Sequence, residues 1–132
     1  MTTTINAVSG NNLQVSADGS GIVKLQSNGI TTNALAWVNW NGVTTATIRS
    51  SYNVSSVTRN SAGDYTVNFT TAMSDANYCI TGSAGGGVSN GVPRVIGPSN
   101  ANPTVSALRV VVTSDFATAS DIAYCSIAIF GN

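Results

Sequence analysis

The sequence predicts an all-β protein, an antiparallel β-sandwich of jelly-roll-like form. First, Thr, Ser, Asn and Gly dominate the composition together with Val, Ile and Ala, whereas the strong helix formers Glu, Lys, Leu and Gln are scarce. Second, turn-forming pairs such as Asp18-Gly19, Asn28-Gly29 and Asn41-Gly42 recur along the chain. Third, the segments between these turns follow one another about every ten residues, a spacing typical of sandwiches and barrels.

The clearest predicted strand runs from Asp64 to Thr70. Its residues Tyr65, Val67 and Phe69 are aromatic or aliphatic and alternate with polar neighbours, which is the period of two expected when one face of a strand is buried. The weaker strand candidates are 22–26, 36–41, 44–52, 55–59, 77–82 and 106–113.

The closing strand, predicted within residues 121–131, breaks this alternation because both of its faces are apolar. The residues of the two faces are Ile122, Tyr124, Ala128 and Phe130, and Ala123, Cys125, Ile127 and Ile129. Such a strand is either central within a closed core or buried against another subunit. Periodicity alone leaves both alternatives open. On the second alternative, Ile127→Asp or Ile129→Asp is expected to weaken assembly.

Composition excludes several classes of function. Five Lys and Arg residues balance five Asp residues for a net charge of zero, so the chain lacks the cationic surface that nucleic-acid binding needs. The sequence contains no His and no Glu, the residues on which acid–base catalysis, catalytic triads and zinc sites draw. We therefore expect no enzymatic activity, no cofactor and no metal site. Because no apolar run reaches the roughly 18–20 residues needed to cross a bilayer, we expect a soluble protein that is not embedded in a membrane.

The chain divides into two parts by apolar density. Residues 1–32 are polar and rich in turns, and they carry too few apolar side chains to bury a core alone. Residues 33–132 contain both Trp, all four Tyr and all three Phe residues, and this part is predicted to be the folded body. We interpret residues 1–32 as a short N-terminal shaft or attachment segment and residues 33–132 as a C-terminal knob. Within the former, residues 2–26 are expected to form β-hairpins or extended strands that intertwine about a threefold axis.

Several segments, taken in order and spacing, resemble a known family. They are Ala36-Trp-Val-Asn-Trp-Asn-Gly42, Ile48–Val57, Gly63–Met73, Asp75-Ala-Asn-Tyr78 and the closing Ile129-Phe-Gly-Asn132. Over most of residues 33–132 the chain is similar to the C-terminal domain of bacteriophage tail fibre proteins. The resemblance implies a β-sandwich or jelly-roll-like knob, assembled as a homotrimer at the distal end of a fibre that contacts the host surface.

On this resemblance we expect the protein to be the tip of a phage tail fibre that binds a host receptor during adsorption. The receptor would be a surface glycan or an outer-membrane protein, and the binding would be non-enzymatic. The protein's other partners would be tail or baseplate proteins, and it would be assembled in the host cytoplasm and reside in the virion. The alternative is a structural virion component, such as a capsid decoration protein or a short head fibre. A fibre-borne depolymerase is disfavoured because Glu and His are missing.

The aromatic residues are predicted to be structural. Trp37 and Trp40 lie in a strand that ends at Asn41-Gly42, where large aromatics fill a core or a subunit interface more often than they stack on sugars. Arg49 lies opposite the apolar side chains of its strand, and we expect it to be solvated or to form a salt bridge with an Asp of a neighbouring chain. The aromatic residues predicted to point inward are Tyr52, Tyr65, Phe69, Tyr78 and Phe130.

The two cysteines, Cys79 and Cys125, each follow a Tyr within a predicted strand. A disulfide is possible if these strands are neighbours, but a phage protein assembled in reducing cytoplasm is expected to keep them as small buried thiols.

The candidate receptor site is the segment between residues 82 and 103, which contains all three prolines. Connections longer than roughly 12–15 residues in compact domains tend to be functional or disordered, and prolines partly fix their shape. Arg94 offers a cationic fork for a carboxylate or phosphate, and the Ser and Asn residues offer hydrogen bonds. The alternative is a variable surface loop packed on a neighbouring subunit, interrupted by a short strand around 94–96. The candidate binding residues are Ser89, Asn90, Arg94, Asn100 and Asn102.

Overall fold

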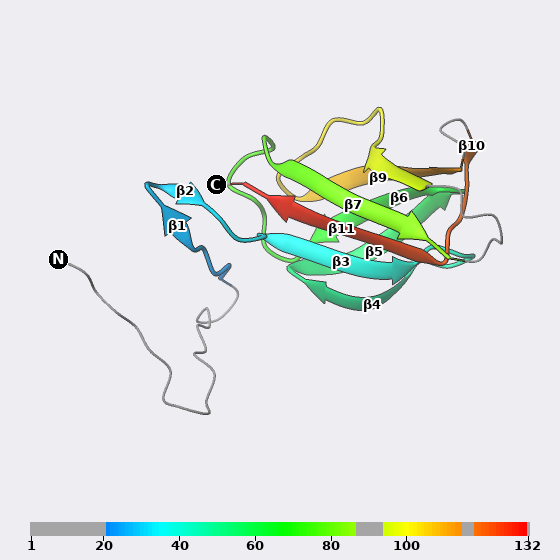
Figure 1. The fold of residues 1–132 in the computed structure, drawn as a ribbon, viewed down its shortest axis with the longest axis horizontal. Coiled ribbons are helices and arrows are strands. Elements are labelled where there is room, and N and C mark those ends of the chain that lie inside the picture. The colour runs from blue at the N-terminus through cyan, green and yellow to red at the C-terminus, as the bar shows by residue number, and fades with distance from the viewer. Residues whose placement is uncertain (1–20, 87–93, 115–117, 132) are drawn as a thin grey trace, which may run out of the picture.

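A computed structural model describes residues 21–86, 94–114 and 118–131, and regular secondary structure in these ranges consists only of β-strands (Figure 1). All pairings are antiparallel, which confirms the predicted all-β, antiparallel class. The strands are β1 (Gln26–Ser27), β2 (Ile30–Thr31), β3 (Ala36–Asn41), β4 (Thr47–Tyr52), β5 (Val54–Ser61), β6 (Asp64–Phe69), β7 (Cys79–Gly85), β8 (Arg94–Pro98), β9 (Ala107–Ser114), β10 (Thr118–Ala119) and β11 (Tyr124–Phe130).

The larger sheet folds over into two layers, an arrangement consistent with a β-sandwich. Its strand order is β4-β3-β11-β7-β8-β9-β6-β5, with β10 paired to β9. Figure 1 shows β4, β3, β11 and β7 in front of β5, β6 and β9. The layers are continuous through β7 and β8, which pair at Ala84 and Arg94. The finer jelly-roll description stays a prediction.

The core lies between the two layers. Trp40 of β3 is fully buried and meets Tyr65 of β6 edge to face, with ring centroids 5.7 Å apart. Burial of these aromatic and aliphatic side chains is the main favourable contribution to the stability of the fold. The other buried apolar residues are Leu35, Ala36, Val38, Val54, Val57, Val67, Phe69, Met73, Tyr78, Leu108, Val110, Val112, Ile122, Cys125, Ile127 and Ile129.

The closing strand, β11, is central in its layer, paired with β3 on one side and β7 on the other. Its inward residues Cys125, Ile127 and Ile129 are buried in the chain's own core, whereas Tyr124 and Phe130 on the outer face are exposed. Of the two alternatives left by the sequence, the structure favours the central strand. A buried charge from Ile127→Asp or Ile129→Asp would disrupt the fold first, so the expected effect of these variants on assembly stays a prediction that they cannot isolate.

The burial of the aromatic residues corrects part of the sequence interpretation. Trp40, Tyr65, Phe69 and Tyr78 are buried, as predicted. The inward orientation predicted for Phe130 and Tyr52 is wrong, since Phe130 is 36% exposed and Tyr52 is half-buried. Trp37 is 38% exposed and is not a core residue of its own chain, and the alternative of a subunit-interface residue stays a prediction. The reason for the exposure is strand parity, because Trp37 pairs with Tyr52 on β4 and with Ala128 on β11, all on the outward side of the sheet.

The hairpin of β1 and β2 lies beside the end of the sandwich where β3 begins (Figure 1). Asn28 and Gly29 at its turn have positive φ angles of 50° and 78°, the conformation that a two-residue hairpin turn requires. The side chain of Asn33 accepts a hydrogen bond from the Leu25 amide at 2.7 Å and donates one to the Val23 carbonyl at 2.8 Å. These bonds tie the hairpin to the chain that enters the body. The predicted strand at 22–26 is wrong apart from its last residue, since β1 begins at Gln26.

Cys79 and Cys125 are both free thiols. Cys125 is buried, as expected, but Cys79 is exposed. Cys79 pairs with Phe130 and Cys125 with Ala84, so five residues of β7 separate the two positions, or about 16 Å along an extended strand. This separation excludes a disulfide within one chain.

Candidate functional site

The outward side chains of β4, β3, β11 and β7 form rows across the sheet that the strand register defines. One row runs Tyr52, Trp37, Ala128 and Thr81, and the next runs Ser50, Asn39, Ser126 and Ser83. In both rows the central strand, β11, contributes a small residue. The sheet surface is therefore lower over β11 than over β3, where Trp37 projects.

A shallow trough of about 430 Å³ lies over β11 as a result. We call this the outer trough. Trp37 forms its largest wall, and Ala128 and Ser126 lie on its central strand between β3 and β7. The residues that line the trough are Trp37, Val38, Asn39, Thr81, Gly82, Ser83, Ser126, Ile127 and Ala128.

Hydrogen bonds fix the polar end of the outer trough. The Asn39 side-chain amide donates to the Ser126 hydroxyl over 2.7 Å, and Arg49 Nη1 donates to Asn39 Oδ1 over 3.4 Å. Arg49 also donates to the Ala123 carbonyl over 2.7 Å, and its guanidinium lies 4.3 Å from the centre of the Tyr124 ring. These contacts leave Arg49 without an ion pair in the described part of its own chain. The expected salt bridge to a neighbouring chain stays a prediction.

The outer face of the layer formed by β9, β6 and β5 differs from the outer trough, because its polar side chains hydrogen-bond one another. Arg109 Nε donates to Asp64 Oδ1 over 2.9 Å, and Asn60 donates to both Asp64 and Thr66. Asn68 donates to Ser56 over 2.9 Å. Hydrogen bonding of the Asp64 carboxylate by Arg109 is the main cause that lowers its pKa. This face is a mutually satisfied polar surface, whereas the outer trough presents an aromatic ring to solvent.

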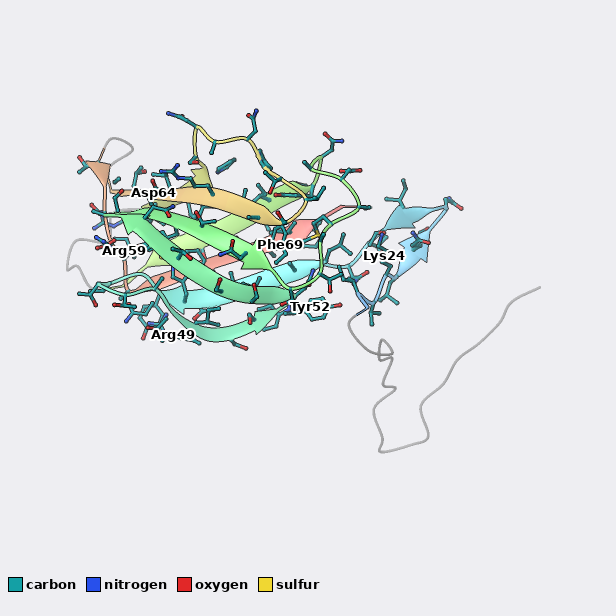
Figure 2. The ribbon with its side chains drawn as sticks, turned by 180° about the vertical axis from the view of Figure 1, so that it is seen from behind. Lys24, Arg49, Tyr52, Arg59, Asp64 and Phe69 are labelled. Atoms are coloured by element: carbon teal, nitrogen blue, oxygen red, sulfur yellow. The ribbon has the colours of Figure 1, made fainter. Side chains whose placement is uncertain are left out.

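The charged residues at the end of the sandwich away from the hairpin are structural. Figure 2 shows Arg49, Arg59 and Asp64 at this end, and Tyr52 and Phe69 towards the other. Asp121 accepts hydrogen bonds from Arg59 Nε at 3.0 Å and from the Gly63 amide at 2.9 Å. The Tyr65 hydroxyl lies 2.8 Å from Asp121 Oδ1 and 2.7 Å from the Gly42 carbonyl oxygen, so two acceptors share its proton.

The environment of this cluster shifts two pKa values in opposite directions. Hydrogen bonding from Arg59, supported by the Gly63 amide and the Tyr65 hydroxyl, lowers the pKa of Asp121 to about 2. Burial, followed by the nearby Asp121 carboxylate, raises the pKa of Tyr65 well above its usual value. Asp121 therefore stays ionised and Tyr65 stays neutral, which is how a stabilising contact behaves.

The candidate binding residues of the 82–103 segment are placed only in part. Ser89 and Asn90 lie outside the described residues. Arg94 begins β8, which confirms the predicted short strand within the segment, and the exposed Asn100 and Asn102 follow the end of β8. Four strand residues, or about 13 Å, separate Arg94 from the end of β8, so the structure does not bring these three together. Their role in receptor binding stays a prediction.

A second hollow, of about 370 Å³, lies beside Asn100. Its charged residues, Asp64 and Arg109, form an ion pair with each other, so neither presents an unpaired charge to a ligand. The lining residues are Asp64, Pro98, Ser99, Asn100, Ala101, Arg109 and Val111.

Sequence reasoning missed Trp37, Asn39 and Ser126 as site residues. One signal was available: Trp37 and Trp40 are three positions apart, an odd spacing that places two strand residues on opposite faces. The other residues could not be found in this way, because Asn39 and Ser126 are 87 positions apart and only the tertiary fold brings them together.

In the ranges that the structure describes, no three residues among His, Cys, Asp and Glu gather as a metal site would need. The same ranges contain no helix capable of spanning a lipid bilayer. Comparison with protein-family models, curated proteins and solved structures found no match for this chain.

Proposed function

We propose that this protein is the receptor-binding tip of a bacteriophage tail fibre and that it holds a host-surface glycan on the outer face of β3, β11 and β7. The observation that carries the proposal is the outer trough, in which an exposed Trp37 lies beside uncharged hydrogen-bonding side chains. Ligand sites in proteins characteristically combine an aromatic surface with a few polar groups in a concave place. The resemblance of residues 33–132 to tail fibre C-terminal domains supplies the biological setting.

A non-enzymatic role is part of the proposal. Arg109 and Arg59 hydrogen-bond the carboxylates of Asp64 and Asp121 and lower the pKa of each. A carboxylate held in this way is a poor general acid and a poor general base near neutral pH, because it neither carries nor readily accepts a proton. Asp64 and Asp121 therefore stabilise the fold through their hydrogen bonds to Arg109 and Arg59.

Assembly as a homotrimer belongs to the same proposal. The β1–β2 hairpin supports it, because Leu25 and Ile30 are 54% and 59% exposed. The register pairs Ser27 with Ile30 and Gln26 with Thr31, so Leu25 and Ile30 share one face of the hairpin. Two large aliphatic side chains on one exposed face are better accommodated against another subunit than in water.

The experiment that tests the proposal measures binding of the purified, fluorescently labelled protein to intact bacteria of a strain panel. We expect saturable binding to a subset of strains, and loss of that binding in derivatives that lack surface polysaccharide. Trp37→Ala should bind at least tenfold more weakly, whereas Val105→Ala, which removes an exposed side chain elsewhere, should bind normally. Absence of binding to every strain by folded protein, together with antibody labelling of the capsid in virions, would favour the structural virion component instead.

A further inference from the structure

We infer that the outer trough is a subsite for one uncharged pyranose ring, stacked on Trp37 and hydrogen-bonded by Asn39, Ser126 and Ser83. This inference rests on the proposed function and deepens it by naming the class of ligand. It places recognition on the sheet face and, of the 82–103 segment, uses only Gly82 and Ser83, which belong to β7.

The shape of the trough fits a flat ring. Its volume of about 430 Å³ lies at the lower end of the roughly 300–1,000 Å³ usual for small-molecule sites. Trp37 and Ala128 are direct register partners, so the indole ring of Trp37 lies next to the small methyl side chain of Ala128 on the central strand. A pyranose has one face of C–H bonds, and this face can lie against the aromatic surface while the hydroxyl rim stays polar.

The polar side chains lie where the hydroxyl rim would be. Asn39 and Ser126 are neighbours of Trp37 and Ala128 in the next row, and Ser83 and Thr81 lie across β11 on β7. The Ser126 hydroxyl accepts a hydrogen bond from Asn39 and therefore keeps its own proton to donate. The hydroxyls of Thr81 and Ser83 can act as donor or acceptor, which matches the dual character of sugar hydroxyls.

The charge of the trough selects against acidic sugars. All nine lining residues are uncharged. Arg49 donates to the amide oxygen of Asn39 in the lining, and it is also engaged by the Ala123 carbonyl and the Tyr124 ring. An acidic group placed over the lining would therefore lose part of its hydration shell against neutral side chains, with only Arg49, at the Asn39 edge of the trough, as an opposite charge. An uncharged hexose or N-acetylhexosamine carries no such cost.

The alternative occupant is a second copy of this chain, and the composition of the trough disfavours it. Asn39, Ser126 and Ser83 form one end of the trough and would be covered in such an interface, whereas the buried centre of a subunit interface is enriched in apolar and aromatic residues. Trp37 is the single aromatic residue in the lining.

The two tryptophans allow a direct test by NMR. The full chain labelled with ¹⁵N gives one indole N–H signal for exposed Trp37 and one for fully buried Trp40. Glucose, galactose, mannose, N-acetylglucosamine and N-acetylgalactosamine would each be added at millimolar concentration, with glucuronate as the charged comparison. We expect at least one uncharged sugar to shift the Trp37 signal in a saturable manner, the Trp40 signal to stay in place, and glucuronate to bind at least tenfold more weakly.

Matched variants separate the site from general effects. Ala128→Leu fills the floor of the trough and should abolish the saturable shift, whereas Thr58→Leu adds a similar side chain on an exposed position of β5 and should leave it unchanged. Ser126→Ala should weaken binding about three- to tenfold by removing one hydrogen-bonding group. Urea unfolding midpoints would verify that each variant is folded.

The outcomes distinguish this inference from the proposed function. If the protein binds host cells but no uncharged sugar shifts the Trp37 signal, the inference is wrong and the proposed function stands. A Trp37 signal that changes on dilution of the protein alone would also overturn the inference, because it would identify a second copy as the occupant. If sugars bind with the expected pattern but no strain is bound, the inference holds and the proposed function fails.

Discussion

Trp37 and Trp40 lie on the same strand, β3, but face opposite sides of the sheet. Trp40 is fully buried against Tyr65, whereas Trp37 is 38% exposed and forms the wall of the outer trough. One residue therefore stabilises the fold and the other is available to a ligand. The two can be altered independently because the sheet separates them.

The first prediction concerns the indole nitrogen of Trp40. Among the described residues, Trp40 Nε1 is buried and has no hydrogen-bond partner. An unsatisfied buried donor costs about 1–3 kcal/mol, so Trp40→Phe removes that cost while it loses part of the packing. We expect the free energy of unfolding to change by less than about 1.5 kcal/mol in Trp40→Phe and to fall by about 3–5 kcal/mol in Trp40→Ala. Urea unfolding followed by circular dichroism measures both, and a loss in Trp40→Phe as large as that in Trp40→Ala would contradict the prediction.

The second prediction concerns acid sensitivity. The pKa of Asp121 is about 2 in the folded protein, below the ordinary value of 3.8. The carboxylate therefore binds fewer protons in the folded than in the unfolded state, and its stabilising effect is complete above about pH 5 and is lost as the pH falls towards 2. Asp64, whose pKa is also lowered, acts in the same direction.

Asp121→Asn isolates this effect. At pH 7 the variant should unfold more easily by about 2 kcal/mol, because Arg59 and the Gly63 amide lose a charged acceptor. Near pH 2 the difference from the unaltered protein should shrink, since Asp121 itself becomes protonated. Asp75→Asn, which keeps an oxygen to accept from the Asn77 amide, is the control. A difference that is independent of pH would exclude the assigned role.

The third prediction concerns Gly63 at the turn between β5 and β6. Its φ angle is +67°, and a Cβ there would collide with the backbone of Ser120 and Val112. Gly63→Ala should therefore lower the free energy of unfolding by about 2 kcal/mol or more. Gly97→Ala is the matched control, because no atom lies within 4 Å of a Cβ at that position. Equal stability of the two variants in urea would show that the turn relaxes without cost.

The sequence predicted the local elements of the fold well. The alternation in Asp64–Phe69 identified β6 and its inward side chains, and β3 was predicted with the bounds that the structure shows. Both cases depend only on residues next to each other in the chain, where the period of two is the direct signature of a half-buried strand.

The site could not be predicted in the same way. The outer trough exists because β11 pairs between β3 and β7, and this pairing joins Asn39 to Ser126 and Trp37 to Ala128. On the sequence alone, Ser126 and Ala128 are small residues in an apolar strand. These small side chains form a trough only because the fold places Trp37, which is far away in the sequence, beside them.

The fourth prediction concerns the proposed homotrimer. Leu25→Asp or Ile30→Asp places a charge on the exposed apolar face of the hairpin and should raise the concentration needed for assembly at least tenfold. Val105→Asp alters a residue on the body with 41% exposure and should assemble normally. Analytical ultracentrifugation at several concentrations measures the effect. A stable monomer of the unaltered protein at micromolar concentration would refute the trimer itself.

The fifth prediction concerns the reactivity of the two thiols. Cys79 is exposed, whereas Cys125 is fully buried and its Sγ lies 3.4 Å from the Ile122 carbonyl oxygen. Burial raises the pKa of Cys125 to about 12, so almost none of its reactive thiolate form is present near neutral pH. A disulfide reagent such as dithionitrobenzoate should therefore modify one thiol rapidly in the native protein and the second only when the core opens.

Two further measurements decide the assignment of these thiols. Cys79→Ser should remove the rapid phase and leave the slow one, and increasing urea should accelerate the slow phase in parallel with unfolding. If neither thiol of the protein reacts with the reagent until a reductant is added, the two sulfurs are bonded within or between chains. A bond within one chain would require β7 and β11 to pair in a register five residues away from the one described, which would also remove the rows that form the outer trough.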